Sequence, residues 1–138
     1  MIHLFAFLLY IAAFGFWVLL LVRGSRGRWA PVPSAVTALA AALHGVALVE
    51  FWQLNGELPL VGPGAAFSSL AFVCAASLVV VLPMREVGRV ALTLLPFVIL
   101  LEGVALVLGI RPSPFTLDFQ GAGFVLHVAF AFLGYQGL

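Results

Sequence analysis

Four ionisable side chains lie inside long apolar stretches of this sequence: His44, Glu50, Glu102 and His127. An ionisable group in hydrocarbon costs on the order of 2.5–3.5 kcal/mol, so such groups usually serve a function. A neutral imidazole is a common metal ligand and can bind haem iron axially. We therefore take His44 and His127 as candidate ligands of haem iron, and Glu102 as a supporting polar group that could orient a histidine or carry a proton.

The predicted depths of these groups are similar. At a helical rise of about 1.5 Å per residue, His44 lies about 15 Å from the outer end of its stretch, and His127 and Glu102 about 12 Å. Two imidazoles from different helices could then hold a flat macrocycle between them. The alternative is that each histidine bonds a carbonyl or hydroxyl of a neighbouring helix and only aids packing. Both interpretations stay open.

Two other ionisable groups are expected to meet water. Glu50 lies only about 6 Å from the outer interface by the same rise, and it points about 120° away from His44 around the helix. His3, at the start of the first apolar stretch, is expected to be solvated at the outer interface.

Pro96 precedes Glu102 and frees a backbone carbonyl, which tends to kink a helix toward a partner or cavity.

The composition requires a largely apolar solvent. The chain has 138 residues, of which 64% are hydrophobic and 8% charged, against about 45–50% and 25% in soluble domains. A soluble fold of this size has too little interior to hide so much apolar surface. The prediction is an all-α, polytopic transmembrane helix bundle, a single domain over residues 1–138 with the lipid bilayer as its partner.

About five stretches have the length of about 20 residues that a bilayer core requires. The first lacks basic residues before it, so it is expected to be an uncleaved anchor rather than a signal peptide. The predicted spans are 2–22, 33–54, 65–82, 90–110 and 119–138.

Arginines set the predicted orientation. When the sides alternate, five arginines fall on one side and Arg111 falls alone on the other. By the positive-inside rule the five-arginine side is cytoplasmic, which puts the N-terminus outside the cytoplasm. The five are Arg23, Arg26, Arg28, Arg85 and Arg89.

Several function classes lack support. A net charge of +1 gives no electrostatic basis for binding nucleic acid. CxxC, Walker A, HExxH and GxSxG motifs are absent from the sequence, so redox, nucleotide-driven or hydrolytic enzymes are not predicted. Cys74 is interpreted as a small packing residue.

The two predicted outer loops, residues 55–64 and 111–119, combine turn formers with apolar side chains. They could form a lid over an apolar ligand, or they could be ordinary interfacial loops.

Small residues four positions apart favour close helix contact in lipid. Ala38 and Ala42 form one such pair, and Ala71 and Ala75 form another. These pairs are the predicted packing positions of the second and third spans.

Short motifs carry a resemblance to a known family. Leu43-His44-Gly45, Phe67-Ser68-Ser69-Leu70, Leu95-Pro96 and Phe124-Val125-Leu126-His127-Val128 follow one another in this order. From about residue 33 onward the chain resembles the N-terminal half of CcsA/CcmC-type cytochrome c assembly proteins, especially their HemX-like branch.

The resemblance implies a multi-pass, non-enzymatic, haem-handling protein of the bacterial inner membrane that works with other cytochrome c assembly proteins. It also implies that His44 and His127 match membrane-embedded histidines that coordinate haem. The sequence departs from the family in lacking a tryptophan-rich outer segment with a WD signature. It also ends after the fifth predicted span, whereas relatives usually have about eight. The sequence could therefore be a fragment or a naturally shortened relative.

Two other function classes remain. The chain could be a small transporter or channel subunit in which His44, Glu50 and Glu102 form a proton or solute path. It could also be a structural membrane subunit whose polar residues only join helices.

Overall fold

The computed structural model describes residues 1–24, 31–83 and 87–112, and this part of the chain is all helical. Four helices follow in order: α1 (Ile2–Arg23), α2 (Pro31–Asn55), α3 (Pro63–Val81) and α4 (Val87–Leu108). The first four predicted spans are confirmed as helices, each end within three residues of its prediction. The predicted fifth span, 119–138, lies outside the described residues, and so does His127.

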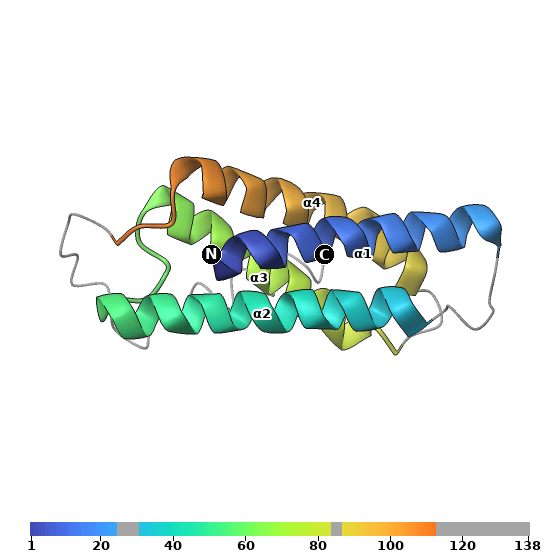
Figure 1. Ribbon diagram of the computed structural model, residues 1–138, viewed down its shortest axis with the longest axis horizontal. Coiled ribbons are helices and arrows are strands. Elements are labelled where there is room, and N and C mark those ends of the chain that lie inside the picture. The colour runs from blue at the N-terminus through green and yellow to red at the C-terminus, as the bar shows by residue number, and fades with distance from the viewer. Residues whose placement is uncertain (25–30, 84–86, 113–138) are drawn as a thin grey trace, which may run out of the picture.

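The four helices run up and down, and each packs against two neighbours (Figure 1). The contacts form a ring in which α1 meets α2, α2 meets α3, α3 meets α4 and α4 returns to α1. The C-terminal end of α2, the start of α3 and the C-terminal end of α4 lie at the same end of the bundle (Figure 1). Side chains that point into this ring can therefore come from all four helices.

All four helices are long and apolar enough to cross a membrane. Each also exposes large apolar side chains, such as Leu8 on α1, Val46 on α2, Val80 on α3 and Leu100 on α4. An outer surface of this kind is unfavourable in water and favourable against acyl chains. The fold is therefore that of a multi-pass membrane protein, and the orientation of its N-terminus stays a prediction.

Proline and glycine mark the helix ends. α2 begins at Pro31 and α3 at Pro63, the position where proline's fixed φ and missing N–H cost least. α1 ends before Gly24, whose φ of 61° is left-handed and whose N–H bonds the Leu21 carbonyl. Glycine adopts this conformation without a side-chain clash.

The small-residue prediction is confirmed for α3 and wrong for α2. Ala71 and Ala75 are fully buried in the core. On α2, Ala42 is exposed and Ala38 only half-buried, whereas Ala40 and Ala41 are buried. Ala38 and Ala42 are the only two alanines of α2 that lie four positions apart, but the buried face of this helix carries Ala40, Ala41 and His44 instead.

The start of α1 is set back from the end of the bundle. Figure 1 shows the N-terminus between α2 and α4 rather than at their ends. His3 lies in the first turn of α1, while His44 lies eleven residues before the end of α2. The first turn of α1 therefore meets the middle of α2.

Candidate functional site

One polar side chain from each of the four helices enters the ring, and these four form the polar cluster of this protein. They are His3 on α1, His44 on α2, Ser68 on α3 and Glu102 on α4. His44, Ser68 and Glu102 are fully buried, and the His3 side chain is 16% exposed. The cluster therefore joins the four described helices, and His3 is its one partly exposed member.

The Glu102 carboxylate lies between the two imidazoles. His3 Nδ1 is 3.0 Å from Glu102 Oε1, a hydrogen-bonding distance. His44 Nε2 is 3.2 Å from Oε2, the other carboxylate oxygen. Despite that short distance, the contact between His44 Nε2 and Oε2 lacks the alignment of a hydrogen bond. Oε2 is buried and has no hydrogen-bond partner in the described part of the chain. The carboxylate is thus close to both rings but incompletely satisfied.

Two hydroxyl groups complete the network. Ser68 Oγ is 2.9 Å from His44 Nε2 and 3.3 Å from His3 Nδ1, so it bridges the two rings. The Tyr10 hydroxyl is 3.2 Å from His44 Nδ1. Both nitrogens of His44 therefore have partners, with Tyr10 at Nδ1 holding the ring so that Nε2 faces the other members of the cluster.

Aromatic rings surround His44 on its remaining sides. The rings of His3, Tyr10 and Phe72 meet it nearly edge-on, with centroid separations of 5.6, 5.9 and 5.6 Å. Gly45 makes room for one of them, because a Cβ there would lie 3.1 Å from the Phe72 ring. His44 thus provides the polar group, and Gly45 beside it leaves the space that the Phe72 ring occupies.

The polar cluster contains two of the ionisable residues singled out from the sequence, and a third lies outside it. His44 and Glu102 meet in the polar cluster, on two different helices. Glu50 is exposed on α2, so a path made of His44, Glu50 and Glu102 is not formed by the described residues. His127, the other predicted haem ligand, lies outside the described residues.

The prediction that His3 is merely solvated is wrong. Its Nδ1 bonds Glu102 because the start of α1 is set back along the bundle. Tyr10 and Ser68 were not predicted as site residues either. Tyr10 follows His3 by seven residues, which places both on one helix face, and this spacing is a signal that could have identified it. Ser68 carries no comparable signal in the sequence.

The donor chemistry at His44 fits haem iron in part. A histidine ligand commonly has its second nitrogen held by a hydrogen bond, as Tyr10 holds Nδ1 here. Nε2, the nitrogen that would face iron, is in contact with Ser68 and Glu102. Haem ligation by His44 therefore requires these two contacts to be replaced.

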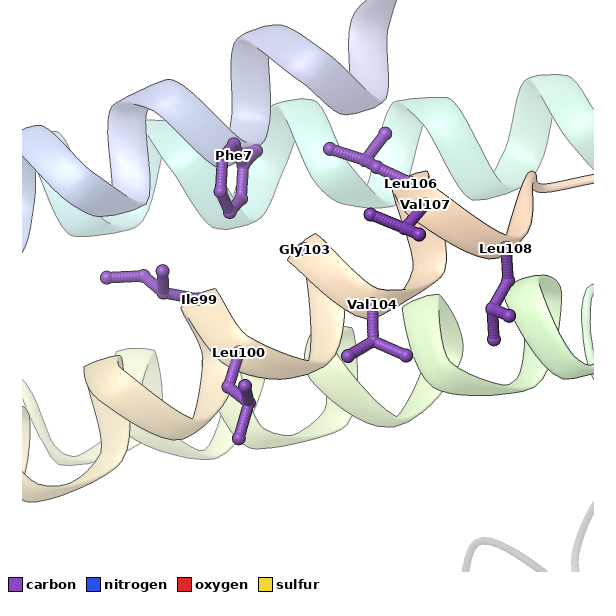
Figure 2. Close-up of a pocket in the computed structure, with 8 residues that line it drawn as sticks. All are labelled: Phe7, Ile99, Leu100, Gly103, Val104, Leu106, Val107 and Leu108. Carbon is purple, nitrogen blue, oxygen red and sulfur yellow. The ribbon is translucent and has the colours of Figure 1, made fainter.

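A surface groove of about 600 Å³ lies elsewhere. It is formed by α4 and Phe7 of α1, and its lining is entirely apolar (Figure 2). Several lining side chains are strongly exposed, including Val107 at 87% and Leu100 at 62%. Its lining residues carry no ionisable or hydrogen-bonding side chain, so the polar cluster is the candidate functional site.

Comparison with known proteins yields no match to a family model, to a curated protein or to a solved structure.

Proposed function

We propose that this protein handles haem inside the bacterial inner membrane as a non-enzymatic factor of cytochrome c assembly. The observation that carries the proposal is His44, fully buried among four apolar helices with its Nδ1 held by Tyr10. The motif order described above, which resembles CcsA/CcmC-type proteins, supports the same function. Other assembly proteins would be its partners.

In this proposal His44 and His127 supply the two axial nitrogens, and haem supplies the iron that they bind. Tyr10 fixes the orientation of the His44 ring through Nδ1. Glu102 and Ser68 occupy Nε2 in the absence of haem and keep that nitrogen from being buried without a partner.

The test is the Soret absorption of protein purified in detergent from haem-replete cells. We expect a Soret band that weakens in His44→Ala and in His127→Ala but persists in Glu50→Gln, since Glu50 is exposed. A wild-type protein that carries no haem after haem is added, with both histidines intact, would refute the ligand assignment.

A second candidate, a proton path, is favoured by the chain His3, Glu102 and His44. These groups have donors and acceptors within 3.0–3.2 Å, and one end of the chain is partly exposed at His3. Proton flux in liposomes that depends on Glu102 but not on Glu50 or on haem would support it. Flux equal to that of empty liposomes would refute it. If the histidine variants lower only stability, the third class, a structural subunit, is favoured.

A further inference from the structure

The polar cluster contains one carboxylate and no arginine or lysine side chain among the described ion-pair partners. With both imidazoles neutral and the carboxylate ionised, the three groups together carry one negative charge. Burying an ionised carboxylate without a counter-charge is strongly unfavourable. Its ion-pair partners within the described residues are the two histidines alone. Either a proton or a bound cation is needed to balance the charge.

Three potential metal-ligating side chains bring their donor atoms into one small volume. One ligand atom each from His3, His44 and Glu102 can be chosen so that all lie within 4.8 Å of one another. Bonds of about 2.0–2.2 Å to zinc put two ligand atoms roughly 3.0–3.5 Å apart at angles between about 90° and 109°. The two imidazole–carboxylate distances fall in this range, 3.0 Å from His3 Nδ1 to Oε1 and 3.2 Å from His44 Nε2 to Oε2. Because they involve different oxygens, one ion would bind either both oxygens or a slightly rotated carboxylate, and the three side chains would close around it.

A second, independent observation points to a missing ligand. Glu102 Oε2 is buried and accepts no well-aligned hydrogen bond in the described part of the protein, although His44 Nε2 lies 3.2 Å away. Buried polar atoms of this kind are rare and usually have an explanation such as an ion. A cation among the three groups would satisfy Oε2 and balance the negative charge together.

We propose that His3, His44 and Glu102 form a site for a single divalent transition-metal ion of the zinc class. Two imidazole nitrogens and one carboxylate oxygen suit Zn²⁺ and its first-row neighbours, whereas Mg²⁺ and Ca²⁺ prefer oxygen ligands throughout. Three protein ligands leave a fourth position for water or for the nearby Ser68 hydroxyl. Tyr10 at Nδ1 orients His44 as the outer partner of a metal-bound histidine does.

The metal site and the proposed haem site share one nitrogen. Both require His44 Nε2, so a metal ion in the cluster and haem on His44 exclude each other. The metal proposal does not rest on the haem proposal, because His3 belongs to the metal site alone and His127 to the haem site alone. Variants of these two residues therefore separate the two proposals.

The test measures Zn²⁺ and Co²⁺ binding to haem-free protein in detergent, purified with a tag that contains no histidine. We expect one Zn²⁺ per chain by elemental analysis after desalting, and visible d–d absorption when Co²⁺ is added. His3→Ala and Glu102→Gln should each weaken Zn²⁺ binding at least tenfold, whereas Glu50→Gln and His127→Ala should not change it. Helical circular dichroism verifies that each variant is folded.

Wild-type protein offers a second measurement that needs no variant. Because an ion that binds only the folded state stabilises it, the unfolding temperature should rise with Zn²⁺ concentration and fall with chelator. Wild-type protein without stoichiometric Zn²⁺ would overturn the proposal, and so would binding that His3→Ala and Glu102→Gln leave intact. A normal Soret band together with absent Zn²⁺ binding would overturn the metal site and leave the haem proposal standing.

Discussion

At the scale of single residues, the chemistry of this protein depends on polar groups that hydrocarbon would otherwise exclude. His44 is the most densely partnered of them, with Tyr10 at one nitrogen and Ser68 and Glu102 at the other. A histidine with partners on both nitrogens is held in one ring orientation, which serves a ligand and a helix-joining residue alike. Removing individual partners should therefore have measurable effects.

Glu102→Ala should destabilise the folded protein in the presence of chelator. The substitution removes the acceptor of His3 Nδ1 and the carboxylate beside His44 Nε2, so we expect a loss of about 1–3 kcal/mol. Thermal unfolding in detergent measures it. Glu50→Ala is the matched control, since Glu50 is exposed on α2 and should change stability by less than about 0.5 kcal/mol. Equal stabilities of the two variants would contradict the prediction.

Tyr10→Phe should cost about 0.5–1.5 kcal/mol, the usual net value of one hydrogen bond. It keeps the buried ring but removes the hydroxyl that lies 3.2 Å from His44 Nδ1. Thr93→Val provides the comparison, because the exposed Thr93 hydroxyl bonds only the Arg89 carbonyl of its own helix. Chemical or thermal unfolding that does not distinguish Tyr10→Phe from wild type would show that this hydroxyl contributes nothing.

At the scale of elements, close backbone contact between α3 and α4 fixes the end of the bundle near the cluster. A Cβ added at Gly64 would lie 2.2 Å from the Gly109 carbonyl oxygen and 3.2 Å from that of Ala105. Because both contacts are to backbone atoms, a side-chain rotation cannot relieve them. The start of α3 and the end of α4 therefore depend on glycine at position 64.

Gly64→Ala should consequently destabilise the protein by about 1–3 kcal/mol through overpacking. Gly15→Ala is the control within α1, since a Cβ there meets no atom within 4 Å. That control should be neutral or stabilise the helix by up to about 1 kcal/mol, as alanine favours helix over glycine. Unfolding midpoints of the two variants test this, and a Gly64→Ala protein as stable as Gly15→Ala would exclude the tight contact.

At the scale of the whole molecule, the arginine distribution predicts which end of the bundle faces the cytoplasm. On this prediction the polar cluster lies in the outer half of the membrane. In a Cys74→Ala background, Gln53→Cys should react with an impermeant maleimide in intact cells, because Gln53 is exposed in the last turn of α2. Ser25→Cys should react only after permeabilisation. The reverse pattern would invert the topology.

The sequence by itself determined the class of this protein and four of its helices. Long apolar stretches without charge are stable only as helices in lipid, because every backbone group must then bond within its own segment. For that reason the helix bounds agree within three residues with the spans read from hydropathy, although α2 and α3 begin two residues earlier than predicted, at Pro31 and Pro63. His44 and Glu102 were identifiable for the same reason, as ionisable groups within such stretches.

Only the tertiary structure decided which side chains meet. Helices that are apolar on all sides lack the polar stripe that would reveal their buried face, so the rotation of α2 was predicted wrongly at Ala38 and Ala42. The position of α1 along the bundle was equally hidden, because axial offset depends on packing against neighbours rather than on the residues of one helix. That offset brings His3 to Glu102, and it converts isolated polar residues into one site.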